Sequence, residues 1–323
     1  DDERGGLRGR LSCGPLDAPA GEPAIIEAPT IAANGSARVE KLVPFMQPGF
    51  HTLVATVVDE DGKELADDKL VEDNRRYMSL RVLRRINVRL VDGQPPLPGH
   101  KQVESEIFGL RLAMAPITKT TAQEEERELD TYTLYPNPDS SLRPSDNWLD
   151  REDLLVLANV ELSSAQKERL ADDIDRFVRR GGGLMIFLGS QVDSTEALKD
   201  YNSLLYRDGK GPLPGKLVVG VGDAADRVKG ELFDTAAADF NHPVLSDFKA
   251  KKEPLKSAEF FRHVKVELPP DSKASVLLKY SGGDAAVIIS EYGAGKVALI
   301  TTSADGDWNS FYGKPDTRSC SAT

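Results

Sequence analysis

Residues 179–191 read RRGGGLMIFLGSQ. The three glycines Gly181 to Gly183 are typical of the end of a helix, because glycine adopts the left-handed backbone conformation that a helix C-terminus favours. The apolar run GLMIFLG (183–189) that follows is typical of a buried strand. The stretch therefore predicts a helix that ends and a core strand that begins within a few residues, which indicates an α/β protein.

The segments on either side alternate in the same way. Ser163 and Gln166 form a capping box that predicts the start of the helix, and its apolar face carries Leu170, Ile174, Phe177 and Val178. A helix-like stripe of Val103, Ile107, Leu110 and Met114 follows an earlier apolar strand. Strands are predicted at INVRLVDG (86–93), TYTLY (131–135), DLLVLANV (153–160) and a hairpin array, SVLLKY, AAVIISEY and KVALITTS (275–303). This alternation predicts a parallel sheet with helices on both faces.

The first part of the sequence has a different pattern. Short β-rich runs are separated by Asn-Gly, Pro-Gly and Asp-Gly turn signals, which predicts a small antiparallel sandwich of about four or five strands. That is fewer than the usual count of about seven for an immunoglobulin-like domain, so we expect strands to be supplied from elsewhere. The domains expected are a flexible lead-in (1–22), a β domain (23–84), an α/β domain (85–312) and a polar tail (313–323).

Composition excludes several classes of function. The 52 acidic and 41 basic side chains give a net charge of -11, which disfavours nucleic acid and anionic lipid as partners. Cys13 and Cys320 are the only cysteines, too few for a disulfide framework or a cysteine-rich metal site. The four histidines have no metal-binding spacing, and DEDGKELADD (59–68) lacks the EF-hand pattern. We therefore expect no metal and no cofactor.

The glycine-rich junction resembles the nucleophile region of class I glutamine amidotransferases. Residues 186–191, IFLGSQ, fall on the family pattern Ile-Cys-Leu-Gly-His-Gln, so that Phe187 stands where the resemblance places the nucleophilic cysteine. A phenyl ring cannot attack an amide. The late His-x-Glu of the family is also missing, since that region reads SADGDWNS (303–310). The resemblance therefore implies a flavodoxin-like, doubly wound domain with no catalytic residues.

Ligands of such sheets bind at the carboxyl ends of the strands, so polar residues there are candidates. Ser190 lacks the Gly-x-Ser-x-Gly flanks of an exposed nucleophile, and His242 lies in an Asn-His-Pro turn that can be purely structural. Aromatic and amide side chains after residue 200 either line a binding surface or form a lid packed on the core. The candidate ligand-binding residues are Ser190, Gln191, Asp193, Tyr201, Asn202 and His242.

From about residue 40 to 310 the chain resembles the extracytoplasmic portion of planctomycete BatA-like membrane proteins, which combine a von Willebrand factor A domain, an immunoglobulin-like or CARDB-like segment and an amidotransferase-like domain. The order of the matching stretches carries the resemblance. They are PFMQPGFHTLVATV, DDKLVEDNRRYMSLRV, INVRLVDG, LVLANVELS, FVRRGGGLMIFLGSQVD, YNSLLYRDGKGPLPGKL, FNHPVL and EYGAGKVALITTSADGDWNSF.

The resemblance implies that the sequence is part of a larger, membrane-anchored protein located in the periplasm. It also implies protein partners such as von Willebrand factor A proteins or components associated with MoxR-type ATPases. Three functions remain open. The first is a non-catalytic interaction or ligand-binding module, the second a hydrolase or carbohydrate-active domain resembling the ThuA-like branch that uses Ser190, His242 or Asp193, and the third a structural spacer.

Overall fold

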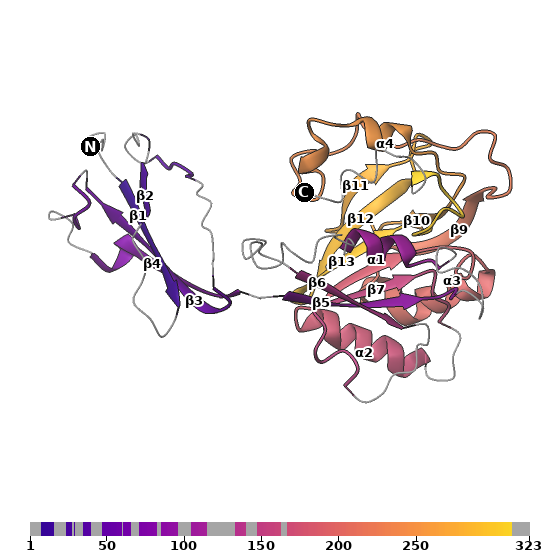
Figure 1. Cartoon of the computed structure of the whole chain (residues 1–323), viewed down its shortest axis with the longest axis horizontal. Helices are drawn as coiled ribbons and strands as arrows, with labels where there is room; N and C mark the ends of the chain where they lie inside the picture. The colour runs from indigo at the N-terminus through magenta and orange to yellow at the C-terminus, as the bar shows by residue number, and fades with distance from the viewer. Residues whose placement is uncertain are drawn as a thin grey trace, which may run out of the picture. The chain divides into compact units, whose positions relative to one another are not determined.

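A computed structural model of the chain describes residues 8–15, 24–27, 29, 35–39, 47–59, 61–65, 71–82, 85–95, 105–114, 133–139, 147–162 and 167–311. The chain divides into two compact units, residues 1–85 with 120–133 and residues 86–119 with 134–323, which are described separately (Figure 1). The structure is mixed α/β with several sheets. None of the described helices is both long and apolar enough to cross a membrane.

The described part of the first unit contains a four-stranded sheet in the order β2-β1-β3-β4, with antiparallel neighbours throughout. Its outer faces carry exposed Phe50, Tyr77 and Met78. A short 3₁₀ turn, η1, precedes the last strand. The elements are β1 (Arg8–Pro15), β2 (Ala24–Glu27), β3 (Gly49–Val58), η1 (Val71–Asn74) and β4 (Arg75–Val82).

Strand β1 corrects the expected lead-in over 1–22. It pairs with β2 on one side and with β3 on the other, in a register that sets Arg8 opposite both Glu27 and Val58. Its sequence, RGRLSCGP, has no strand-like alternation, and its order comes from backbone hydrogen bonds to two neighbours. One of the short β-rich runs of this part, ARVEKLVPFM (37–46), forms no strand over 37–39, and the rest of that run lies outside the described residues.

The second unit is built on a seven-stranded sheet in the order β11-β12-β13-β8-β7-β5-β6 (Figure 1). The inner neighbours β5, β7, β8 and β13 run parallel, whereas β13, β12 and β11 form an antiparallel meander at one edge. The hairpin array expected at this edge is confirmed. The strands are β5 (Arg85–Asp92), β6 (Thr133–Asp139), β7 (Leu154–Ala158), β8 (Gly183–Phe187), β11 (Ser275–Lys279), β12 (Ala285–Tyr292) and β13 (Gly295–Ile300).

Helices cover both faces of this sheet, as the alternating pattern predicts. Successive strand residues point to opposite faces, so Leu155 and Leu157 pack with helix α2 (Lys167–Arg179), whereas Val156 and Ala158 pack with residues of helix α1 (Phe108–Met114). The apolar stripe of α2 is buried as expected from its spacing. Burying each such side chain contributes roughly 1.5–3 kcal/mol.

The glycine run ends α2 as predicted. Gly181 has a φ of 113°, and the backbone N–H of Gly182 donates to the carbonyl of Phe177 over 3.0 Å. A Cβ on Gly182 would lie 2.4 Å from the ring of Phe177. The chain can therefore turn directly from the helix into β8 only with glycine there.

The segment between β8 and β11 packs against the core of the second unit. It contains a two-stranded antiparallel sheet, β10-β9, and several short helices. The elements are α3 (Thr195–Tyr201), the π-helix η3 (Asn202–Tyr206), η4 (Arg207–Gly209), β9 (Lys216–Gly222), η5 (Ser246–Phe248), α4 (Glu253–Ser257) and β10 (Arg262–Glu267).

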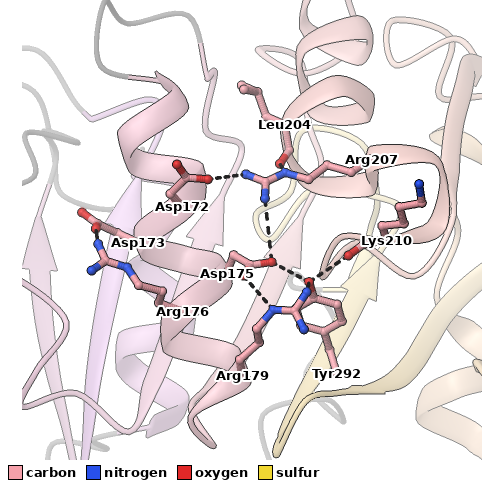
Figure 2. Close-up of polar contacts among 9 residues, drawn as sticks. All are labelled: Asp172, Asp173, Asp175, Arg176, Arg179, Leu204, Arg207, Lys210 and Tyr292. Carbon is pink, nitrogen blue, oxygen red and sulfur yellow. Dashed lines mark hydrogen bonds and ion pairs between the residues drawn. The ribbon is translucent and has the colours of Figure 1, made fainter.

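A polar network ties α2 to this segment and to β12 (Figure 2). The Tyr292 hydroxyl lies 2.5 Å from Asp175 Oδ1 and 2.9 Å from the carbonyl of Lys210, and Arg179 Nε donates to Asp175 Oδ2 over 2.8 Å. Burial and the bond to Asp175 raise the pKa of Tyr292 to about 12. Burial alone would raise the pKa of Asp175, but Tyr292 and Arg179 lower it below its ordinary value.

Candidate functional site

Polar side chains gather where the parallel strands end. β5 ends at Asp92, β7 is followed by Asn159, and β8 is followed by Ser190, while residues 303–307 follow β13. Because the carboxyl ends of parallel strands meet at the same edge of the sheet, this is the edge at which α/β sheets bind ligands. We call the set Asp92, Gln94, Ser105, Glu106, Asn159, Ser190, Asp305 and Asp307 the carboxyl-edge cluster.

Asn159 lies at the centre of the carboxyl-edge cluster. Its side chain is buried, and its amide nitrogen donates to Glu106 Oε1 and lies 3.3 Å from Gln94 Oε1 and 3.4 Å from Ser190 Oγ. Its oxygen accepts the backbone N–H of Gln191 over 2.8 Å. One amide thereby joins the ends of β5 and β8 to Glu106, which lies two residues before α1.

The backbone of Asn159 is held in the left-handed region, at a φ of 53°. Asparagine tolerates this conformation better than most residues. Glycines on both neighbouring strands leave room for it: a Cβ on Gly93 would lie 1.8 Å from the carbonyl oxygen of Asn159, and one on Gly189 would lie 2.4 Å from its Cγ. Both glycines are therefore required by close packing around a single amide.

Glu106 is the deepest carboxylate of the cluster, with 1% of its surface exposed. Oε1 accepts from Asn159, whereas Oε2 is buried and has no hydrogen-bond partner. Burial and the nearby charge of Asp305 raise the pKa of Glu106 to about 8. The side chain is positioned through Ser105, whose hydroxyl donates to Asp92 Oδ2 over 2.5 Å.

Asp305 and Asp307 approach Glu106 from the loop after β13. Carboxylate oxygens of the three residues lie within 4.8 Å of one another. The loop is held by Asp305 Oδ1, which accepts the backbone N–H of Asp307 over 2.9 Å, and by Ser303 Oγ, which accepts that of buried Trp308 over 3.2 Å. Burial raises the pKa of Asp305 above its ordinary value. Asp307 is exposed and lies at the mouth of the cluster.

Phe187, expected at the position of an amidotransferase nucleophile, is the last residue of β8. Its ring packs against the apolar cluster that contains Val88, Val156 and Ala158. Its backbone is not in the left-handed region, whereas that of Asn159 on the neighbouring strand is. The β8 end thus presents an apolar side chain in ordinary strand geometry.

Two of the six predicted binding residues, Ser190 and Gln191, belong to the site. Ser190 is exposed beside Gln94 and Asn159, and the backbone of Gln191 is bonded to Asn159. Asp193 lies just beyond and pairs with Arg262 over 2.6 Å.

The predictions for Tyr201 and Asn202 are corrected by their contacts, whereas that for His242 stays a prediction. Tyr201 is fully buried and donates its hydroxyl to the carbonyl of Val160 over 2.7 Å. The side-chain nitrogen of Asn202 donates to the carbonyl of Leu217 over 2.7 Å, and its side-chain oxygen accepts the backbone N–H of Leu217 over 2.9 Å. His242 forms hydrogen bonds within its own turn, to Asp239 and to the two residues after Pro243. Packing of the short helices explains the positions of Tyr201 and Asn202. The Asn-His-Pro turn explains the local bonds of His242.

Ser190, His242 and Asp193 do not form a catalytic group. No hydrogen bond joins any two of these three described residues, because each is engaged by different neighbours. Among the described residues, the hydrogen-bond partners of Ser190 Oγ are the amides of Asn159 and Gln94, and an amide cannot act as a general base at neutral pH.

Seven of the eight residues of the carboxyl-edge cluster escaped prediction, Glu106, Asn159, Asp305 and Asp307 among them. Asn159 and the two aspartates follow buried strands, so the rule that ligands bind at carboxyl ends could have singled them out. Glu106 gives no such signal. It lies two residues from Glu104 in an ordinary polar segment, and only tertiary packing buries it.

No protein family matches the chain, and no curated protein matches it. Among solved structures, the cytoplasmic protein STM3548 from Salmonella typhimurium is 16% identical with a TM-score of 0.49, over 72% of this chain and 94% of that one. The cytoplasmic protein STM1381 from Salmonella typhimurium LT2 is 13% identical with a TM-score of 0.48, over 72% and 96%. An exo-β-1,4-mannosidase from Opitutaceae bacterium strain TAV5 is 13% identical with a TM-score of 0.39, over 74% and 34%. At these scores the likenesses carry no argument about function.

Proposed function

We propose that the α/β unit is a non-catalytic ligand-binding module on a degenerate class I glutamine amidotransferase-like fold, with the carboxyl-edge cluster as its binding site. One observation carries the proposal. At the strand end where such enzymes hold their nucleophile, this chain has Phe187, which is partly buried and packed against the core, while the nearby hydroxyl of Ser190 meets amides instead of a base.

The cluster itself favours a polar ligand. Its buried floor consists of the carboxylate of Glu106 and the amide of Asn159, and its exposed rim carries Gln94, Ser190 and Asp307. Carboxylate and amide oxygens at the floor suit a cation or a hydrogen-bond donor. An anionic ligand would be repelled by the same groups.

The wider context is a further part of this proposal and is supported by the sequence resemblance alone. The first unit would be a partial immunoglobulin-like or CARDB-like domain, and the whole chain would belong to a BatA-like, membrane-anchored protein outside the cytoplasm. Von Willebrand factor A proteins or MoxR-associated components would be its partners. In that setting the module would hold a ligand or a protein without transforming it.

A paired assay tests the proposal. Wild type, Ser190→Ala and the exposed control Ser246→Ala are incubated with amide, ester and glycoside substrates, and their melting temperatures are measured with a panel of polar small molecules. We expect no turnover that depends on Ser190 and at least one ligand that raises the melting temperature of wild type and Ser246→Ala more than that of Ser190→Ala. Ligand at 100 times its Kd would stabilise by about 2.7 kcal/mol. Turnover abolished by Ser190→Ala would establish the hydrolase alternative instead.

A further inference from the structure

We propose that the carboxyl-edge cluster binds a hard divalent cation, of the class of Ca²⁺ or Mg²⁺, through the carboxylates of Glu106, Asp305 and Asp307. The inference deepens the proposed function, since it names a ligand for that same site and rests on it.

The geometry of the three carboxylates suits one ion. Their oxygen atoms lie within 4.8 Å of one another, although they come from a residue two positions before α1 and from the loop after β13. Oxygen ligands lie roughly 2.3–2.6 Å from Ca²⁺, so two oxygens on opposite sides of one ion are about 5 Å apart. The spacing is therefore within the span of a single coordination sphere.

The unpartnered oxygen of Glu106 is a separate indication of a ligand. Glu106 is 1% exposed, its Oε1 is held by Asn159, and its Oε2 has no hydrogen-bond partner. A buried carboxylate oxygen without a partner is costly, and native structures satisfy nearly all such atoms. Because Asn159 fixes the carboxyl group, Glu106 is held in one position beside the two aspartates.

The charge of the three carboxylates is not balanced within the described residues. The ion pairs formed there by lysines and arginines involve other acids. Arg227 reaches the same loop, but its guanidinium donates to the carbonyl oxygens of Gly306 and Asp307, at 3.0 and 2.8 Å. When all three are ionised, carboxylates so close together repel one another, and a divalent cation would relieve most of that repulsion.

The chemistry of the ligands selects the kind of ion. The three side chains offer only carboxylate oxygens, which suit Mg²⁺, Ca²⁺ and Mn²⁺, whereas zinc and copper sites use histidine or cysteine. Exposed Asp307 gives an ion a route from solvent, and buried Glu106 gives it a fixed anchor.

Terbium luminescence tests the inference, because Trp308 directly follows Asp307 and tryptophan sensitises the emission of Tb³⁺ bound nearby. The full chain, freed of metal by a chelator, is titrated with Tb³⁺ and then with Ca²⁺ and Mg²⁺ as competitors. We compare wild type with Glu106→Gln, with Asp307→Asn, and with Asp247→Asn, an exposed aspartate in η5.

We expect saturable emission that Ca²⁺ or Mg²⁺ displaces, with an affinity roughly tenfold or more weaker in Glu106→Gln and in Asp307→Asn and unchanged in Asp247→Asn. Asp307 is exposed, so its variant keeps the fold even if Glu106→Gln does not. Absence of saturable emission, or equal affinity in Asp307→Asn and wild type, would overturn the cation site. The thermal-shift panel of polar molecules is read independently, so the proposed ligand-binding function can stand when the cation site fails.

Discussion

Two acidic clusters of the α/β unit differ in how their charge is compensated. On α2, Asp172 meets Arg207 over 2.7 Å, Asp173 meets Arg176, and Asp175 meets Arg179 and Tyr292 (Figure 2). In the carboxyl-edge cluster, Glu106, Asp305 and Asp307 lie within 4.8 Å of one another with no basic side chain paired to them among the described residues.

The difference separates structural acids from acids that are available to a ligand. The α2 cluster joins the helix to residues 207–210 and to β12, and each of its carboxylates has a partner within the protein. The carboxyl-edge cluster is equally well ordered by hydrogen bonds, yet its charges oppose one another. Folding alone gives no reason to place them together, whereas binding of a cation or donor does.

The largest effect on stability is expected when the close packing around the carboxyl-edge cluster is disrupted. Gly93→Ala places a Cβ 1.8 Å from the backbone oxygen of Asn159, so the strand ends must move apart. We expect a loss of about 2–4 kcal/mol in the free energy of unfolding. Urea denaturation measures it, with Gly306→Ala as the matched control, because a Cβ there makes only an ordinary contact at 3.9 Å. Equal losses in the two variants would contradict the packing argument.

An intermediate loss of stability is expected from a substitution in the acidic cluster on α2. Asp175→Asn removes the charge that Arg179 and Tyr292 share, and should destabilise the protein by about 1–2 kcal/mol at pH 7. Because the folded pKa of Asp175 lies below its ordinary value of 3.8, the stability it contributes is present above that value and is lost as the pH falls further. The difference between wild type and variant should therefore shrink in acid.

The control for that measurement is Arg176→Ala. Arg176 is a mostly exposed partner of Asp173 on the same helix, so its removal should change stability by less than about 0.5 kcal/mol. A loss in Arg176→Ala as large as that in Asp175→Asn would show that the bonds of Asp175 to Arg179 and Tyr292 stabilise the protein no more than an exposed ion pair does.

The smallest effect has the opposite sign. Glu106→Gln keeps an oxygen for Asn159 and removes a buried carboxyl group whose pKa is raised to about 8, so the folded protein no longer has to hold a proton that the unfolded chain releases at neutral pH. In metal-free buffer we expect it to stabilise the protein by roughly 1 kcal/mol. Chemical denaturation with and without added Ca²⁺ measures the change. Destabilisation in metal-free buffer would mean that the carboxylate has an internal partner after all.

The sequence predicted the parts of the fold that rest on apolar runs. Strands β7 and β8, the buried stripe of α2 and the β11 to β13 meander follow from runs of aliphatic residues with glycine turns between them. Strand β1 could not be predicted, because RGRLSCGP has no pattern and is ordered by its neighbours.

The site was predictable only in part, for a similar reason. Ser190 and Gln191 were identified because they directly follow a recognisable strand. Tyr201 and Asn202 were misjudged because a sequence does not show whether a loop aromatic faces the core. Glu106 was missed because its environment is created by three distant segments that meet at the sheet edge.

A crystal of the chain grown with Mn²⁺ would test the ligand site most directly, through the anomalous scattering of the ion. We expect one strong peak bonded to Glu106 and to at least one of Asp305 and Asp307, and its loss in Glu106→Gln. A lysine or arginine from another part of the chain paired with Glu106, with no ion beside it, would contradict this and would make the carboxyl-edge cluster as internally balanced as the cluster on α2.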